Sequence, residues 1–342
     1  MAIDNKIDFV ISWVDESDPK WRKEFEYYSS KEGRAVDNSA IRYRDWGTLR
    51  YCFRGVEKYA PWVNKIYFVT YGHLPKWLNT DNPKLVIVKH EEFVPAEYLP
   101  TFNSNVFEFF FHKIKGLSDR FVYFNDDAFL IDHVSPERFF RNGLPCDIGG
   151  LTAITTKGMF GCTVYLALDL IRANFNKKEA VARNRSKWYS LEYPRLALHN
   201  LLYYKRAHFT GFTNHHLPQG YLKETYHEVW EHCENDLRRT CKNRFRTYGD
   251  VCHWIIRYWQ LASGNYTPCD VFKDGFCYHI SDDNIMKCIV SLRNRTFKLI
   301  CINDNDGMDD VEEYQKLIID AFDEILPETC SYETHHDTKV SG

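Results

Sequence analysis

Short, continuous apolar runs recur through the first 150 residues, and they constrain the fold more than any other feature of the sequence. Runs of this length that are apolar without alternation are typical of strands buried on both faces of a sheet. We therefore predict strands at Lys6–Val14, Lys65–Tyr71, Lys84–Lys89 and Phe121–Phe124.

Segments with helical periodicity separate these strands. Trp46–Tyr59 repeats apolar residues at helical spacing and stops before Pro61. Asn105–Ile114 behaves similarly, and we expect Ser104 to be its N-cap. Because strands alternate with helices, the sequence predicts an α/β fold whose mostly parallel sheet carries helices on both faces.

The chain changes character in its second half. Strand character returns at Thr296–Ile302, and Met308–Ile325 is an amphipathic helix. Between these two parts, helical periodicity is present at Leu191–Tyr204, Tyr221–Asn243 and Asp250–Ala262. We expect one composite domain over residues 1–330, followed by a disordered tail at 331–342. Its α/β core would span about 1–160 and 266–330, with a helical insertion at about 161–265.

Composition excludes several classes of protein. The chain has 342 residues and a net charge of −3, which argues against a partner that is bulk nucleic acid. The N-terminal segment lacks the basic start of a signal peptide, and no run of 18 apolar residues exists, so we expect at most peripheral membrane contact. Eleven cysteines without repeated spacing indicate free thiols in a reducing cytoplasm.

Acidic and amide residues follow three of the predicted strands. They are Asp15, the run Asn125-Asp126-Asp127, and the run from Asn303 to Asp306. Each could be a turn, because Asn and Asp side chains bond to the local backbone. Together they favour a ligand site, since the carboxyl ends of parallel strands meet at one rim. Clustered carboxylates need a compensating cation, and a divalent ion shared with phosphate oxygens is the usual solution.

Several other motifs leave alternatives open. Neither a P-loop nor a G-x-G-x-x-G fingerprint is present, so standard phosphate-binding loops are excluded. His215 and His216 form either a polar loop or a general base. The basic run that contains Arg244 and Arg246 is either a solvated helix face or a phosphate contact. A zinc site among His232, Cys233, Cys241, Cys252 and His253 would match no known spacing.

Four separated blocks give the sequence a family resemblance. They are IDFVISWVDESDPKW, the long block from RYRDWGTLRYCFRGVEKYAPWVNKIYFVTYG to DRFVYFNDDAFL, the short HLP at His216–Pro218, and LICINDN. In their order and spacing these blocks resemble the Stealth family of sugar-phosphate transferases, which includes bacterial capsular-polysaccharide enzymes and the catalytic subunit of the lysosomal N-acetylglucosamine-1-phosphotransferase.

The resemblance implies a GT-A-like nucleotide-sugar-binding core and a role for each matched residue. Asp126 and Asp127 would hold Mg²⁺ or Mn²⁺ against the donor diphosphate, with Asp127 also counted as catalytic. His216 would take the proton of the acceptor hydroxyl, and Arg246 would steady the phosphate. The donor pocket would be lined by Asp15, Asn103 and Asp304.

The implied reaction transfers a sugar-1-phosphate from a UDP-hexose or UDP-HexNAc, for example N-acetylglucosamine-1-phosphate, to a hydroxyl of a glycan acceptor, and it releases UMP. It would serve capsular or cell-surface polysaccharide synthesis in the cytoplasm, at the inner face of the plasma membrane. Three alternatives remain: a metal-dependent GT-A-type glycosyltransferase that releases UDP, a non-catalytic sugar- or nucleotide-binding protein, and a zinc-stabilised interaction module.

Overall fold

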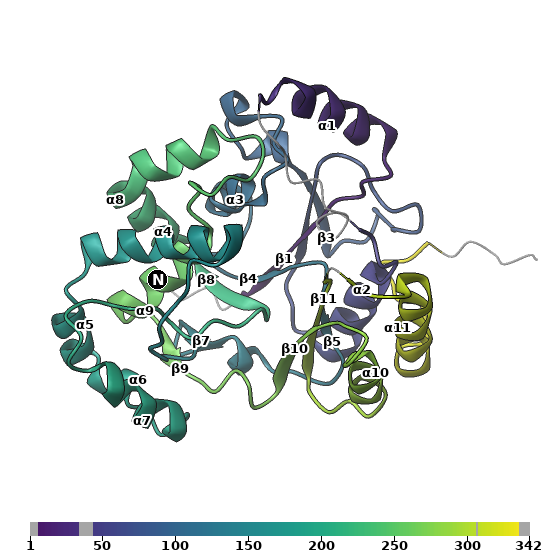
Figure 1. Cartoon of the computed structure of the whole chain (residues 1–342). Coiled ribbons are helices and arrows are strands. Elements are labelled where there is room, and N and C mark those ends of the chain that lie inside the picture. Colours follow the sequence, from purple (N-terminus) through teal and green to yellow (C-terminus); the bar gives the residue numbers. More distant parts are fainter. Residues whose placement is uncertain (1–5, 34–43, 306, 335–342) are drawn as a thin grey trace, which may run out of the picture.

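The computed structural model describes residues 6–33, 44–305 and 307–334, which form three sheets and the helices that surround them (Figure 1). The strands are β1 (Asp8–Trp13), β2 (Ile66–Thr70), β3 (Leu85–Lys89), β4 (Arg120–Phe124), β5 (Ala128–Leu130), β6 (Phe140–Arg141), β7 (Leu144–Asp147), β8 (Gln219–Leu222), β9 (Thr267–Pro268), β10 (Gly275–His279) and β11 (Leu299–Asn303).

The main sheet has the strand order β3-β2-β1-β4-β8. Its first four strands are parallel, with Phe9 opposite Ile66 and Val122 opposite Phe9 on the other side. Only β8 runs antiparallel, beside β4. The predicted α/β class with a mostly parallel sheet is therefore confirmed, and all four strands predicted in the first 150 residues are present within two residues of their expected ends.

Helices cover both faces of this sheet (Figure 1). The helices are α1 (Pro19–Lys31), α2 (Leu49–Tyr59), α3 (Ser104–Glu108), α4 (Gly158–Asn174), α5 (Lys177–Arg183), α6 (Arg185–Trp188), α7 (Pro194–Tyr203), α8 (Lys223–Cys241), α9 (Trp254–Ser263), α10 (Ile285–Arg293) and α11 (Val311–Ile325). None of the helices in the described ranges combines the length and the hydropathy of a membrane-spanning segment.

Alternate residues of each strand feed two separate hydrophobic cores, as the period of a strand requires. Val10 and Tyr123 point into the core made with α4, α8 and α9. Phe9 and Phe124 point into the opposite core, made with α2, α10 and α11. The helices of the predicted insertion thus form one of the two layers that bury the sheet.

A second sheet, of order β10-β11-β5, meets the main sheet at the end of β4. The chain leaves β4, turns through Asn125-Asp126-Asp127, and enters β5, which pairs antiparallel with β11. The backbone N–H of Ile302 donates to the carbonyl of Asp127 at 2.8 Å. As a result, the turn after β4 and the end of β11 lie side by side.

Local predictions fail where long-range contacts decide the structure. Tyr221 was predicted to begin a helix, but it lies in β8 opposite Phe121, and α8 begins only at Lys223. The segment 161–265 is therefore not purely helical. The N-cap of α3 is Asn103 and not Ser104, because the Asn103 side chain accepts a hydrogen bond from the Asn105 N–H.

Residues 331–334 do not belong to a disordered tail. Tyr332 is buried against Phe53, and Glu333 pairs with the buried Arg54 on α2 through two contacts of 2.6 and 2.9 Å. Arg54 also donates to the carbonyl of Leu326. The two close contacts of the buried guanidinium are with Glu333, so the segment is held in place; Asp323 of α11 lies farther from Arg54, at 3.7 Å. Residues 335–342 lie outside the described residues.

We expect Glu333→Gln to lower the free energy of unfolding by about 3 kcal/mol, because it leaves the buried Arg54 charge with only the exposed carboxylate of Asp323, at 3.7 Å. Burial alone would raise the pKa of Glu333, but the hydrogen bonds from Arg54 and from the Cys330 backbone, together with the charge of Arg54, outweigh it and lower the pKa. The stabilisation is therefore present above the ordinary carboxyl pKa and is lost as pH falls through the lowered one. Urea denaturation at several pH values measures both effects.

The matched control is Glu324→Gln, which breaks the bidentate but exposed pair between Arg293 and Glu324. An exposed pair contributes about 0–1 kcal/mol. Equal losses in the two variants would contradict the role assigned to the buried pair.

Candidate active site

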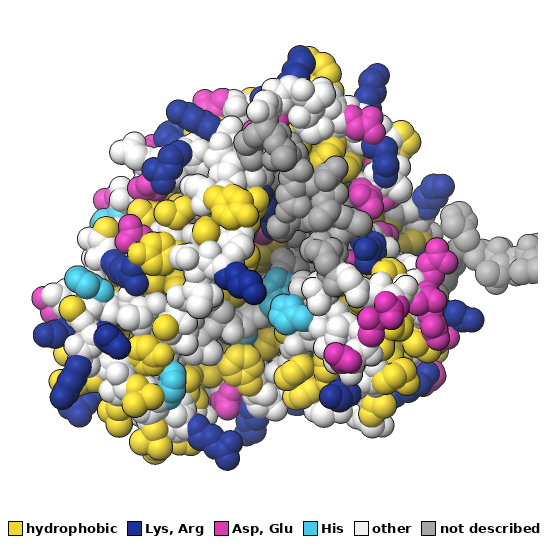
Figure 2. Space-filling model, viewed as in Figure 1, with side chains coloured by type: hydrophobic (Ala, Val, Ile, Leu, Met, Phe, Trp, Pro, Cys, Tyr) yellow, Lys and Arg dark blue, Asp and Glu magenta, His cyan; other side chains and the backbone are white. Residues whose placement is uncertain are grey.

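A cleft of about 610 Å³ opens at the carboxyl ends of β1 and β4. Figure 2 shows histidine side chains beside a hollow in the centre of this face. Five of the residues predicted from the sequence line the cleft, although they come from four separate parts of the chain: Asp126, Asp127, His216, Arg246 and Asp304.

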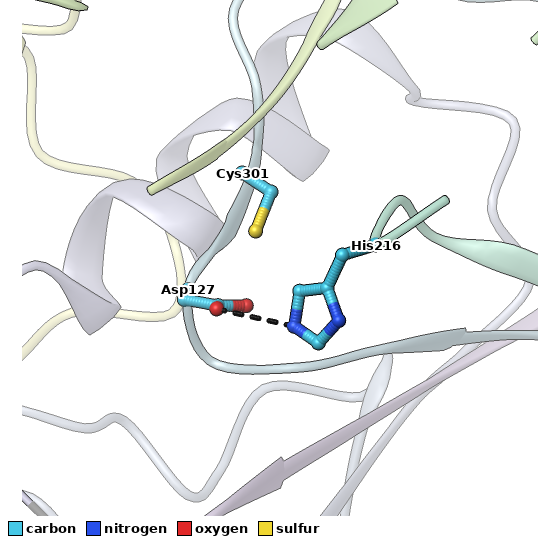
Figure 3. Close-up of side chains that lie close together, drawn as sticks. All are labelled: Asp127, His216 and Cys301. Atoms are coloured by element: carbon cyan, nitrogen blue, oxygen red, sulfur yellow. Dashed lines mark ion pairs between the residues drawn. The ribbon is translucent and has the colours of Figure 1, made fainter. Parts of the chain in front are cut away.

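Asp127 and His216 face each other inside this cleft (Figure 3). The imidazole Nε2 lies 3.3 Å from Oδ2 of Asp127, which also accepts a hydrogen bond from Asn303 at 3.0 Å. Burial alone would lower the pKa of His216, but the carboxylate outweighs it and raises the pKa to about 9. Burial would likewise raise the pKa of Asp127, and His216 holds it below its usual value. The pair is therefore charged at neutral pH.

Asp126 lies where the carboxylates of the cleft repel one another. Desolvation, followed by the charges of Asp127 and Asp45, raises the pKa of Asp126 to about 7. A carboxyl group in this situation is poised to bind a cation, because a positive ion removes the repulsion that raises its pKa. Asp126 and Asp127 together could supply the oxygen ligands that a hard divalent ion prefers.

One carboxylate oxygen of Asp127 is available to bind such an ion. Its Oδ1 is buried and accepts no hydrogen bond from the residues that the structure describes. Cys301 lies beside the pair, and its thiol sulfur is within 4.8 Å of possible ligand atoms of Asp127 and His216 (Figure 3). Burial raises the pKa of Cys301 well above its usual range, so the thiol stays protonated and is a poor ligand for Mg²⁺. The residues present therefore fit a hard cation bound by carboxylates.

Two arginines lie on the wall of the cleft. Arg246 donates to the Ser104 hydroxyl at 2.6 Å, and both residues line the cavity. Arg44 lies 3.2 Å from Asp304. Arg244, the alternative to Arg246 in the sequence, instead donates to the carbonyl of Pro100 and is not among the lining residues. The structure thus favours Arg246 for a phosphate contact.

Two residues expected in the donor pocket are not among those that line the cleft. The Asp15 carboxylate accepts a hydrogen bond from the Ser17 backbone at 2.8 Å, as an Asp in a turn does. Asn103 is fully buried, caps α3, and donates to Asp250 at 2.8 Å. Both side chains shape the elements that carry the cleft.

A buried ion pair fixes the loop that carries His216. Arg257 on α9 makes two contacts of 2.8 Å with Asp147 at the end of β7, and it also donates to the carbonyl of Thr213 at 3.0 Å. His215 lies 3.3 Å from Asp147 with its side chain almost wholly buried. Burial, followed by the charge of Arg257, lowers the pKa of His215 to about 4. Both histidines border the cleft, but His215 is neutral and lies against Asp147, whereas His216 faces the carboxylate of Asp127.

The sequence predicted neither this buried ion pair nor a second network, of hydrogen-bonded side chains, on the wall of the cleft. Glu108 lies 2.8 Å from His253 and accepts a hydrogen bond from Tyr123 at 2.9 Å. Tyr123 in turn bonds to Ser12 of β1. One signal was available: Arg257 is a single charge in the otherwise apolar run Trp254–Trp259, which indicates a buried partner.

The fold and the cleft define an α/β protein with an acidic site at the strand ends, and comparisons with known proteins identify its family. Residues 5–33 match Stealth protein CR1, conserved region 1, and residues 42–146 match Stealth protein CR2, conserved region 2. The chain belongs to the Stealth family.

Curated relatives extend over almost the whole chain. It is 42% identical to a capsular polysaccharide phosphotransferase WcwK of Streptococcus pneumoniae, over 96% of this chain and 98% of the relative. It is 39% identical to the receptor polysaccharide phosphotransferase WefC of Streptococcus gordonii, over 96% and 99%. The exopolysaccharide phosphotransferase cps2G of Lactiplantibacillus plantarum is 36% identical over 96% of both chains.

We expect His216→Ala to lower turnover by ~10²–10⁴-fold, the usual contribution of a general acid or base, with little change in donor affinity. His215→Ala removes a neutral, buried side chain, so it should lower the thermal midpoint of unfolding more than it lowers turnover. Steady-state kinetics and thermal melts of both variants separate the two roles. A folded but inactive His215 variant beside an active His216 variant would reverse the assignment.

Proposed function

We propose that the protein transfers a sugar-1-phosphate from a UDP-hexose or UDP-N-acetylhexosamine to a hydroxyl group of a glycan, forming a phosphodiester and releasing UMP. The relatives are named polysaccharide phosphotransferases, and this chain is a transferase of the same kind, acting in the synthesis of capsular or extracellular polysaccharide. All eleven cysteines are free thiols, which suits the reducing cytoplasm where we place the reaction.

The observation that carries the proposal is the meeting of Asp126, Asp127, His216 and Arg246 in one cleft. Carboxylates on one side and a guanidinium on another suit a diphosphate, whose oxygens can share a cation with the carboxylates and accept hydrogen bonds from Arg246. A site for an uncharged sugar alone would not need these charges. The arrangement therefore supports a nucleotide-sugar donor.

Mg²⁺ or Mn²⁺ fits the carboxylates of Asp126 and Asp127 for the reasons given above. When bound there, the ion would neutralise charge on the carboxylates and on the donor diphosphate. Because it would weaken the attraction between Asp127 and the protonated imidazole of His216, it would make the His216 proton easier to lose.

The side chains then have separate tasks in the reaction. An acceptor hydroxyl attacks the β-phosphorus of the donor, the bond between the two phosphates breaks, and UMP leaves. His216 takes the proton of the attacking hydroxyl, while Arg246 donates hydrogen bonds to phosphate oxygens whose charge grows in the transition state. Ser104 holds the guanidinium of Arg246 in place. The anomeric bond of the sugar is never broken, so its configuration is retained.

We expect the purified protein, with UDP-N-acetylglucosamine, Mg²⁺ and a glycan acceptor, to release UMP. Attack at the β-phosphorus leaves one phosphate on the nucleotide, whereas attack at the anomeric carbon leaves two. Chromatography of the nucleotides and phosphorus NMR of the product distinguish the two reactions. UDP as the sole nucleotide product, with a saccharide that contains no phosphorus, would sink the proposal in favour of a glycosyltransferase.

Removal of the cation, or of its carboxylates, tests the metal site. Asp126→Asn and Asp127→Asn keep the shape of each side chain but lose the charge, and we expect turnover to fall by at least ~10²-fold in each. Calorimetric titration of Mg²⁺ in the presence of UMP gives a second readout that does not depend on turnover. Asp15→Asn is a control at a strand end outside the cleft wall. Unchanged Mg²⁺ affinity in both cleft variants would refute the assignment.

A further inference from the structure

Large exposed apolar side chains are concentrated in one segment at the edge of the molecule. Five of the thirteen large hydrophobic side chains that are exposed among the described residues lie within Leu191–Tyr204, a segment of α7 and its flanks. They are Leu191, Leu198, Leu201, Leu202 and Tyr204. A patch of this kind on a protein that remains in water marks an interaction surface.

The leucines of α7 form a stripe with a cation at each end. Leu198 and Leu202 are 68% and 73% exposed and lie one turn apart, with Leu201 beside them. Arg195 precedes the leucines by one turn of the helix, and Lys205 lies in the turn that follows the end of α7 at Tyr203. We call these five residues the α7 stripe. Figure 2 shows hydrophobic and basic side chains together at the lower left edge, where Figure 1 draws α5–α7.

The opposite side of α7 holds the helix firmly, so the leucines cannot turn inward. Asn200 is fully buried: it accepts a hydrogen bond from Leu151 N–H at 2.7 Å and donates to the carbonyls of Gly149 and Trp188. Lys177 donates to carbonyls at the end of the helix, including that of Arg206 at 2.9 Å. The stripe is thus presented to solvent by a fixed helix.

The charge around the stripe is positive. Arg195, Lys205 and Arg206 are exposed, and none of them forms an ion pair with a described residue. The single carboxylate between residues 190 and 208, that of Glu192, lies 3.8 Å from Arg141. Leucines flanked by unpaired cations are the pattern of a helix that lies in the interface of an anionic bilayer, with its apolar side chains among the lipids and its cations at the headgroups.

We propose that the α7 stripe docks the protein on an anionic membrane surface. Two other occupants fit less well. A second copy of the chain would bring like charges together, which opposes association through this face. A glycan would call for aromatic rings to stack on, whereas four of the five exposed apolar side chains of this segment are leucines. No residue from 191 to 206 is among those lining the cleft, so the inference does not depend on the proposed function.

Co-sedimentation with vesicles, without any substrate, tests the proposal. We expect the whole chain to bind vesicles in which half of the lipid is phosphatidylglycerol, to bind pure phosphatidylcholine weakly, and to be released as salt increases. Leu198→Gln with Leu202→Gln should lower binding roughly tenfold or more, because two apolar side chains no longer enter the interface. Arg195→Gln with Lys205→Gln should lower it by about fivefold for each cation removed.

The matched control is Met286→Gln with Val290→Gln. These two side chains are 56% and 52% exposed and lie one turn apart on α10, away from the stripe. Thermal melts of the variants check that each one folds. The control pair should leave vesicle binding unchanged.

Three results would overturn the proposal. They are no binding of the unchanged protein to anionic vesicles, equal binding to phosphatidylcholine, and an equal loss of binding in the α10 control. Analytical ultracentrifugation provides a further check, because a dimer that the leucine variants convert to monomers would identify the stripe as a contact between copies and would also overturn it.

Discussion

The excess of carboxylates at the end of β4 is the constraint to which the rest of the site responds. Asp126 and Asp127 are adjacent in the chain, and Asp45 is close enough to affect the pKa of Asp126. Carboxylates that are close together and shielded from water repel one another unless positive charge compensates them. His216 and Arg44, from other segments of the chain, neutralise part of the negative charge of the cleft by pairing with Asp127 and Asp304. A cationic ligand would neutralise the negative charge that remains and would so stabilise this arrangement of carboxylates.

The position of His216 depends on a second electrostatic interaction, deeper in the protein. Burying Arg257 and Asp147 is costly unless each satisfies the other, and their paired contacts of 2.8 Å do so. Because Arg257 also donates to Thr213, the pair fixes the loop that ends at His216. The helices of residues 161–265 are therefore not an accessory to the α/β core, since α9 supplies the cation that fixes the loop before His216.

The parts of the fold that local pattern determines could be predicted from the sequence. Phe121–Phe124 forms a strand because it is apolar and short, and Met308–Ile325 forms a helix because its apolar residues repeat at helical spacing. Tyr221 was mispredicted because its place in β8 is set by pairing with β4, one hundred residues away. The same holds for Glu333, whose burial depends on Arg54 and leaves no local signal.

Site residues could be predicted where a strand end and a family block coincided, as for Asp126, Asp127 and Asp304, and these line the cleft. Asp15 satisfied the same rule, but its carboxylate bonds to the turn that follows β1, a choice that depends on local geometry. The charge state of His216 could not be read from the sequence at all. With its pKa at about 9, the imidazole is protonated at neutral pH and cannot accept a proton. In the proposed reaction the imidazole therefore has to lose this proton before it can act as a base, and positive charge bound at Asp127 would favour that loss.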